Sequence, residues 1–276
     1  AGQQLLNSLG PQQIAAGFSE YELKINSIKT ILAGGRTKEG LAVDLEMVNY
    51  QLEELNKYAD QTIYSFSDMT RNIGKFTNSG VDLETSVQSI KGIANAAALS
   101  GSNAEEAARA MYNFAQGLSA GYIKLIDWKS IENANMATVD FKTELLESAV
   151  AAGTLEKTAD GMYKVLTGGG MDEPISATKM FNQSLEKQWM TSEVLTATLT
   201  RYSDITTEIG AKATEAATKV RTFHQLMDTT KEALGSGWAM TFENLFGDYA
   251  EATKLWTMVS DATGEIIKKN SDARND

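Results

Sequence analysis

The sequence predicts an all-α fold, a multi-helix module with long amphipathic helices. Proline occurs only twice in 276 residues, at Pro11 and Pro174, so little interrupts a helix. Along several segments apolar residues recur at steps of four and three, which places them on one face of a helix. Small polar residues and glycines stand where such segments begin and end, as helix caps require.

The first residues, 1–19, are small and polar and predict a loosely ordered arm. A helix is expected from about Glu20 to Leu32, ended by Gly34–Gly35. The next segment predicts an amphipathic helix, and its inner face is Leu41, Leu45, Val48, Leu52, Leu55 and Ala59. A further short helix has Ser67 as its expected N-cap, and its buried side is Met69, Ile73 and Phe76.

Asp82 is the expected N-cap of a longer helix, whose inner face is Leu83, Val87, Ile90, Ala94 and Ala97. Ser102 and Glu105 have the spacing of a capping box that opens another helix, which Gly117 and Gly121 end. The residues expected to face inward are Ala104, Ala107, Ala108, Met111, Phe114, Ala115 and Leu118. Those expected to face solvent are Glu105, Glu106, Arg109, Asn113 and Gln116.

A helix over Thr138–Ala152 should bury Phe141, Leu145 and Ala149 and end at Gly153. The segment 155–166 fits a small β-hairpin that turns at Asp160–Gly161, followed by a flexible link at Gly168–Gly170. These features divide the chain into the arm 1–19, a helical core 20–153, a hairpin and linker 154–175 and a helical part 176–276.

In the C-terminal part we expect a helix from Ser176 and another from Ser192. The inner face of the first is Ala177, Met180, Phe181, Ser184, Leu185 and Gln188, and that of the second is Leu195, Leu199 and Tyr202. Two long helices, 205–234 and 238–268, are expected on either side of Gly235–Gly237. The first carries a seam of Ile209, Ala213, Ala216, Val220, Phe223, Met227, Thr230 and Leu234.

The helix 238–268 carries the longest aromatic seam of the chain, at Trp238, Phe242, Leu245, Tyr249, Ala252, Trp256 and Val259. The steps alternate between four and three, close to the heptad rhythm of helices that pack along each other. Two interpretations stay open. The seam either packs inside its own fold or forms a surface for a partner helix or a second copy.

Net charge and composition exclude several functions. At −11 and a pI near 4.8 the chain repels phosphate backbones and anionic lipids, so nucleic acid is a poor partner. It has no cysteine, and therefore no disulfide or thiolate chemistry. No apolar run approaches the roughly 18 residues of a membrane span, and no secretory signal is present. The first residue is Ala, which suggests a processed product or an excised piece.

Three weak signals for catalysis or ligand binding fail on chemistry. His224 and Asp228 are one helical turn apart, but zinc needs three or four ligands and the chain has no second histidine. Gly168–Gly170 lacks the G-K-[ST] that follows in a phosphate-binding loop. The pairs Glu53–Glu54 and Glu105–Glu106 are expected on solvent faces, where nothing raises a pKa. We expect no catalytic residue, no cofactor and no metal.

Several strings resemble the tail tape measure proteins of long-tailed bacteriophages and prophages. They are KEALGSGWAMTFENLFGDYAEATKLW (231–256), ALSGSNAEEAARAMYNFAQGLSAGYIKLIDWKSIENANMA (98–137), NKYADQTIYSFSDMTRNIGKFTNSGVDL (56–83) and KQWMTSEVLTATL (187–199). The resemblance implies a structural virion protein that sets tail length, occupies the tail lumen and leaves ahead of DNA at ejection. The implied partners are further copies in three-fold or six-fold arrangement, tail tube protein and distal tail or baseplate proteins. The implied locations are the tail lumen and, during assembly, the bacterial cytoplasm.

Complete members of this family are usually far longer than 276 residues, so a fragment or a shortened member is expected. One continuous helix of this length would reach about 410 Å. A compact domain would have a radius of gyration of about 19 Å, and the glycine breaks and caps favour that form. Two other functions remain as alternatives: a tail-borne enzyme that cuts peptidoglycan, and a helical secreted effector.

Overall fold

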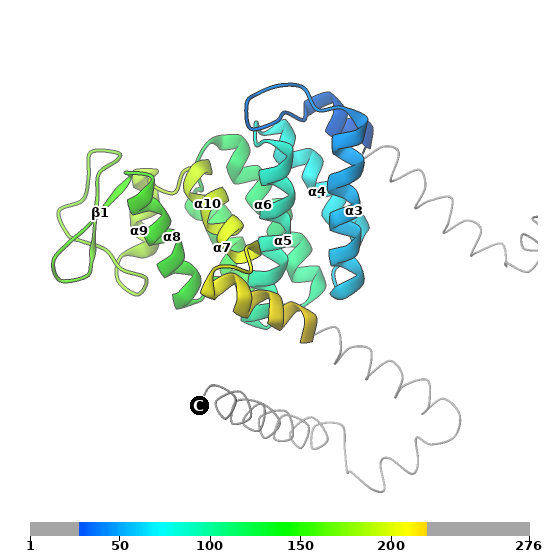
Figure 1. The fold of residues 1–276 in the computed structure, drawn as a ribbon. Helices are drawn as coiled ribbons and strands as arrows, with labels where there is room; N and C mark the ends of the chain where they lie inside the picture. Colours follow the sequence, from blue (N-terminus) through cyan, green and yellow to red (C-terminus); the bar gives the residue numbers. More distant parts are fainter. Residues whose placement is uncertain (1–27, 220–276) are drawn as a thin grey trace, which may run out of the picture. The chain divides into compact units, whose positions relative to one another are not determined.

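The computed structural model describes residues 28–219, which belong to one compact unit. The fold is all-α apart from one small hairpin, as predicted (Figure 1). In order, the elements are a helical stretch at 28–34, α3 (Leu45–Gln61), α4 (Phe66–Asn78), α5 (Leu83–Ser100), α6 (Ala104–Ala120), α7 (Leu125–Asn133), α8 (Val139–Ala151), β1 (Leu155–Lys157), β2 (Tyr163–Val165), α9 (Phe181–Ser184), the 3-10 helix η1 (Leu185–Lys187), α10 (Ser192–Ser203) and a helical stretch at 208–219.

Helix α5 lies at the centre of this unit and packs against α3, α4, α6 and α10. Its contact with α10 is the most extensive in the fold and depends on a glycine. A Cβ added at Gly92 would lie 1.9 Å from the carbonyl oxygen of Leu199. The two backbones therefore approach more closely than any side chain at position 92 would allow.

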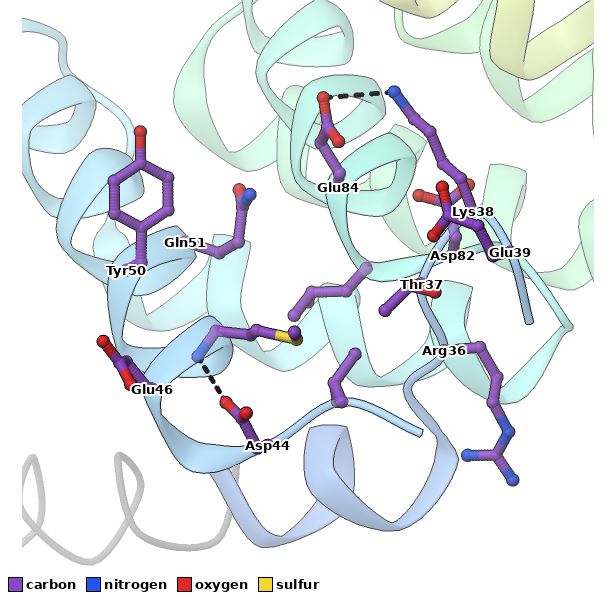
Figure 2. A pocket seen from close by; sticks show the side chains of 13 residues that line it. Arg36, Thr37, Lys38, Glu39, Asp44, Glu46, Tyr50, Gln51, Asp82 and Glu84 are labelled. Atoms are coloured by element: carbon purple, nitrogen blue, oxygen red, sulfur yellow. Dashed lines mark hydrogen bonds and ion pairs between the residues drawn. The ribbon is translucent and has the colours of Figure 1, made fainter. Parts of the chain in front are cut away.

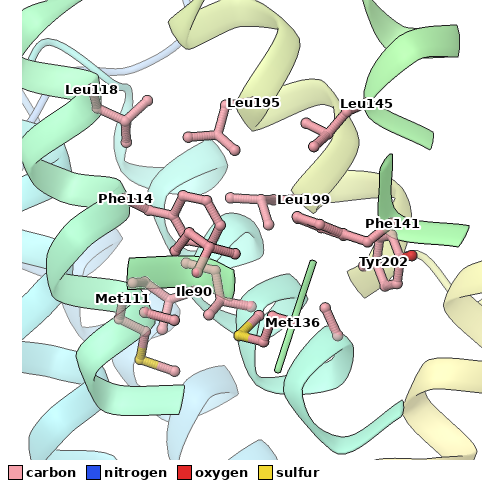
Figure 3. Packing of buried hydrophobic residues seen from close by; sticks show 14 of the residues in the cluster. Ile90, Met111, Phe114, Leu118, Met136, Phe141, Leu145, Leu195, Leu199 and Tyr202 are labelled. Carbon is pink, nitrogen blue, oxygen red and sulfur yellow. The ribbon is translucent and has the colours of Figure 1, made fainter. Parts of the chain in front are cut away.

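The core is one continuous cluster to which every α-helix from α3 to α10 contributes. Figure 3 shows Phe114 of α6, Phe141 of α8 and Leu199 of α10 meeting over Ile90 of α5. Aromatic rings extend this cluster. Phe141 lies 6.3 Å from Trp128 between ring centroids, and Phe181 bridges Trp128 (5.1 Å) to Trp189 (5.5 Å). Offset and edge-on pairs at these distances add to the free energy of burial.

One predicted N-cap, Asp82, is confirmed, and two are wrong by one or two residues. Asp82 accepts from the backbone N–H of Thr85, and at the start of α8 the structure adds a cap at Thr138, which accepts from the backbone N–H of Phe141. Helix α4 is capped by Ser65, which accepts from the backbone N–H of Asp68, and not by Ser67.

The capping box of α6 is Asn103 with Glu106, and not Ser102 with Glu105. Asn103 Oδ1 accepts from the backbone N–H of Glu106, whose carboxylate accepts from that of Asn103. The Ser102 hydroxyl is buried and donates to the carbonyl oxygen of Ala134 (2.5 Å), so it holds the end of α7 instead of opening α6.

The prediction that α3 extends back to Leu41 is wrong. Asp44 accepts from the backbone N–H of Met47 (2.8 Å) and begins the helix at Leu45. Val48, Leu52 and Leu55 are buried as predicted, and Tyr58 is buried beside them, while Ala59 is only partly buried. Leu41 lies before the helix and Leu45 is its first residue, and their side chains remain 66% and 53% exposed. The four-and-three spacing of apolar residues therefore continues beyond the buried part of the helix.

Helix α7 was not anticipated from the sequence, although it places Trp128 and Ile131 in the core. Its nine residues are too few for a clear period. Gly117 was expected to end α6, but it lies inside the helix and is buried. A Cβ there would meet the side chain of Ile123 at 2.1 Å. Only Gly121, with φ of 83°, ends the helix.

The predicted hairpin is present, with Leu155 paired to Val165 and Lys157 paired to Tyr163. The two-residue turn is wrong, because this register leaves residues 158–162 in the loop, where the backbone N–H of Thr158 donates to the carbonyl oxygen of Met162. Each of Gly168–Gly170 has positive φ. A Cβ at Gly168 would lie 2.8 Å from the backbone of Lys187, so this turn is seated against η1.

The helix expected from Ser176 is wrong for its first part. Residues 177–180 form bends, Met180 has φ of 59°, and helical structure is confined to α9 and η1. Helix α10 begins at Ser192 as predicted, with Leu195, Leu199 and Tyr202 buried. The helix expected from 205 begins at 208, where Thr207 Oγ1 accepts from the backbone N–H of Gly210.

Several expectations lie outside the described residues. They are the arm 1–19, the beginning of the helix near 20, the end of the helix 205–234, the helix 238–268 with its seam, and the pair His224–Asp228. Within residues 28–219, no helix has both the length and the apolar character to cross a membrane.

Candidate functional site

The two glutamate pairs considered from the sequence, Glu53–Glu54 and Glu105–Glu106, take part in a helix cap and in ion pairs at the surface. Glu105 is exposed with Arg109 Nη1 3.8 Å away, and Glu106 closes the capping box of α6. Glu54 pairs with Lys57 at 2.8 Å, and Glu53 is exposed. The Lys57 ammonium lowers the pKa of Glu54, which is opposite to what a general acid needs. Among residues 28–219 no group of three or more His, Asp or Glu side chains is arranged to hold a metal ion.

One carboxyl group in the described region does have a raised pKa. Glu144 on α8 is half-buried, and this burial raises its pKa, although Arg201 of α10 lies 3.0 Å away and opposes the shift. One turn later, Glu147 has a lowered pKa because the Lys157 ammonium and the Tyr163 hydroxyl (2.6 Å) both donate to it. The two carboxylates thus join α8 to different neighbours, α10 and the hairpin.

A polar network crosses the core beside α5. Asn95 is buried, and its Oδ1 accepts from the Tyr58 hydroxyl of α3 (2.7 Å). Its Nδ2 donates to the carbonyl oxygen of Tyr202 (2.8 Å) and to Thr214 Oγ1 (2.9 Å). One side chain therefore joins α3, α5, α10 and the helical stretch 208–219. Sequence spacing could not identify this role, since Asn95 looks like one polar residue in a run of alanines.

The hollow at the start of α3 and α5 is the clearest candidate for a binding site. It has a volume of about 480 Å³ and lies between α3, the loop 36–44 and the beginning of α5 (Figure 2). The loop folds back on itself through a bridge between Arg36 and Ala42 and turns at Gly40, with φ of 82°. The backbone N–H of Leu83 donates to the carbonyl oxygen of Arg36 (2.8 Å) and fixes the loop to α5. We call this hollow the α3–α5 groove.

Carboxylates outnumber cations around the α3–α5 groove. Its lining includes Glu39, Asp44, Glu46, Asp82 and Glu84, against Arg36 and Lys38. Lys38 is already paired with Glu84 at 3.1 Å, and Arg36 Nη1 donates to the carbonyl oxygen of Gly35. Asp44 and Asp82 cap their helices, as helix N-termini favour. No ion pair to Glu46 is formed within residues 28–219.

The apolar part of the groove consists of Val43 and Leu83, which are buried, and Met47 and Tyr50, which are exposed. Figure 2 shows Tyr50 and Gln51 along α3, facing Lys38 and Glu84 across the groove. Sequence reasoning missed this site because it assigned Leu41 and Leu45 to the core and gave no role to Met47 or Tyr50. A signal was present in the apolar residues that fall off the buried stripe of α3.

The sequence model of a family described as "Tape measure protein" matches residues 39–169. This region belongs to the tape measure protein family. The matched region is nearly half of the chain and runs from the loop before α3 to the turn after β2. Comparison with curated proteins gives no match, and neither does comparison with solved structures.

The tape measure domain of this chain therefore contains α3 to α8 and the hairpin, and α10 completes its core by packing on α5 and α8. Tape measure proteins are structural components of phage tails, and the resemblance of the sequence to that family is confirmed over this region. The seam at Trp238, Phe242, Leu245, Tyr249, Trp256 and Val259 lies beyond the match and beyond the described residues.

Proposed function

We propose that this chain is a folded module of a tape measure protein that sets tail length during assembly, occupies the tail lumen and leaves ahead of DNA at ejection. The family match over residues 39–169 is the observation that carries this proposal. The module is proposed to reside in the virion, inside the tail, after a period in the bacterial cytoplasm during assembly.

The compact fold of residues 28–219 supports different roles for different parts of the tape measure protein. Its longest helix, α5, has 18 residues, which corresponds to about 27 Å of rise. Helices α3, α4, α6 and α10 pack against α5 and do not continue it, so these residues cannot span a length in proportion to their number. We therefore infer that this module marks one position along the tail while other parts of the tape measure protein measure length.

Tail length measured by electron microscopy tests this inference. A tandem duplication of residues 45–203 would lengthen a tail by about 240 Å if those residues formed a continuous helix. A second folded module, with a radius of gyration of about 15 Å, should leave the length nearly unchanged. A tail lengthened in proportion to the added residues would contradict the inference, as would extended density for this region inside an assembled tail.

The aromatic seam 238–259 is proposed as a surface between copies, in three-fold or six-fold arrangement, within a tail of tube and distal or baseplate proteins. Light scattering coupled to size exclusion on the purified chain tests this proposal. A trimer or hexamer that becomes monomeric in Trp256→Ala supports it, with Trp128 left intact as an internal tryptophan. A monomeric wild-type chain would contradict it.

We also infer that the chain is not an enzyme, since its family is structural and its exposed carboxylates serve caps and surface ion pairs. Purified peptidoglycan incubated with the chain should keep its turbidity. A turbidity loss that persists after repeated purification would contradict the inference and favour a wall-cutting function.

A further inference from the structure

Exposed apolar side chains are concentrated at the start of α3, and part of them line the α3–α5 groove. Eleven large hydrophobic side chains of the described residues are exposed, and four of them, Leu41, Leu45, Met47 and Tyr50, lie within ten residues of sequence. Two of the four line the groove, whose floor is closed by Val43 and Leu83. A hollow with an apolar floor and an exposed apolar margin is the geometry of a docking site.

The charge around the groove restricts what can dock there. Lys38 is paired with Glu84, and Asp44 and Asp82 are engaged by backbone N–H groups. Glu46 remains without an ion pair within residues 28–219, at the margin of the apolar floor. Phosphate backbones and anionic lipids would be repelled, whereas a lysine or arginine beside an apolar side chain would match both features.

A second copy of this chain is a poorer occupant than a different polypeptide. The chain carries a net charge of −11, so two copies meeting at this groove would bring acidic surfaces together. The groove volume of about 480 Å³ admits a few side chains, while the exposed Met47 and Tyr50 form an apolar margin that reaches solvent. A helical segment can fill a groove and cover its margin at once.

We propose that the α3–α5 groove binds a basic amphipathic helix of another polypeptide. An apolar side chain of that helix enters between Met47 and Leu83, and a neighbouring lysine or arginine pairs with Glu46. This interaction is independent of how the chain measures tail length, and its failure would leave the tape measure function untouched.

The test uses the full 276-residue chain and a fluorescently labelled 14-residue helical peptide of leucine and lysine, with binding followed by anisotropy. A peptide with glutamate in place of each lysine controls for charge, and one with serine in place of each leucine controls for apolar contact. We expect saturable binding of the Leu/Lys peptide alone. Equal binding of either control peptide, or no binding of the Leu/Lys peptide, would overturn the proposal.

Two pairs of variants locate the site. Glu46→Lys and Tyr50→Ser should each weaken peptide binding about tenfold, because each removes a contact at the groove. Their controls are Glu186→Lys on η1 and Ile126→Ser on α7, which alter equally exposed residues elsewhere and should change affinity less than about twofold. Equal losses in groove and control variants would show non-specific attraction and overturn the proposal.

Two further measurements identify competing occupants. Sedimentation velocity of the wild type and of Tyr50→Ser shows whether the groove joins copies, and a dimer lost in this variant would overturn the proposal in favour of a second copy. A photo-crosslinker at position 50 that reacts within its own chain would show a covered groove, with the same consequence. An oligomeric state that Tyr50→Ser leaves unchanged, together with a crosslinker that labels the Leu/Lys peptide, supports the proposal.

Discussion

Helices α5 and α3 are nearly equal in length but differ in how they are buried. Twelve of the eighteen residues of α5 are buried, and they lie all around the helix. Only four of the seventeen residues of α3 are buried, along one stripe. A helix buried all around belongs to the scaffold, while one buried on a single stripe keeps a face for other contacts.

This contrast assigns stability of the tape measure domain to α5 and binding of other molecules to the outer face of α3. Substitutions on α5 should change the free energy of unfolding, because its small residues set the distance to α10 and its one buried amide links four helices. Substitutions on the outer face of α3 should change binding and leave unfolding almost unaffected. Four measurements would sharpen or break this division.

Gly92→Ala should have the largest effect. The added Cβ would lie 1.9 Å from the Leu199 carbonyl oxygen, so α5 and α10 must separate. We expect unfolding free energy to fall by about 2–4 kcal/mol, even though alanine favours a helix over glycine. Urea denaturation followed by circular dichroism measures the change.

The matched control is Gly74→Ala on α4. Its added Cβ would lie 2.9 Å from Thr30 Cγ2, a side-chain atom that can rotate away. The gain in helix propensity should nearly offset this contact, so the net change should stay within about 1 kcal/mol. Similar losses in both variants would mean that the close approach of α5 and α10 has no special weight.

Asn95→Ala should have the second largest effect. It leaves the Tyr58 hydroxyl and the Tyr202 carbonyl oxygen without their partner in the core, at a cost of about 2–3 kcal/mol. Tyr58→Phe removes one of these bonds and should cost about 1 kcal/mol. A double-mutant cycle should give a coupling of about 1 kcal/mol. Additive losses would show that the two side chains act separately.

The sequence predicts only part of the difference in burial between α5 and α3. The inner face of α5 was predictable because Leu83, Val87 and Ile90 follow the helical period and Asp82 precedes them. The burial of Gly92 and Asn95 was not predictable, since it depends on α10, more than ninety residues later in the chain. Long-range packing of this kind leaves no local period.

For α3 the period itself was misleading. Leu41 and Leu45 continue the four-and-three spacing, yet Asp44 caps the helix after Leu41, and Leu45 remains exposed at its first turn. The same limit explains the one-residue error in the capping box of α6, where Ser102 and Asn103 both have a glutamate three residues later. Local spacing is compatible with several N-cap residues, and tertiary contacts such as that of Ser102 with Ala134 determine which one caps the helix.

The carboxylates of α8 should make the free energy of unfolding depend on pH, with a smaller effect than the two substitutions on α5. The pKa of Glu147 is lowered in the folded state by Lys157 and Tyr163, so its contribution to stability is full above the unfolded pKa near 4.5 and is lost as pH falls through the folded pKa. Glu147→Gln should therefore lower stability at pH 7 by less than about 1 kcal/mol, given its partial exposure. The difference from the wild type should vanish below about pH 3.

Glu144→Gln is the control for this pH dependence. Burial raises the pKa of Glu144, so ionisation above the folded pKa costs stability, and the neutral variant escapes that cost while losing the pair with Arg201. We expect thermal melts at pH 7 to show a smaller loss than for Glu147→Gln. A loss at pH 7 that persists unchanged at pH 3 in Glu147→Gln would mean that packing, and not charge, is responsible.

Leu45→Ser on α3 should have the smallest effect, because its side chain is already 53% exposed and no buried group depends on it. Unfolding free energy should change by less than about 0.5 kcal/mol. The same substitution at Leu52, two turns further along the same stripe of α3 but only 3% exposed, should cost several kcal/mol through lost burial and an unpaired buried hydroxyl. If both variants were equally destabilised, the exposed first turn of α3 would belong to the scaffold, and exposure of an α3 side chain would not mark a surface free for a partner.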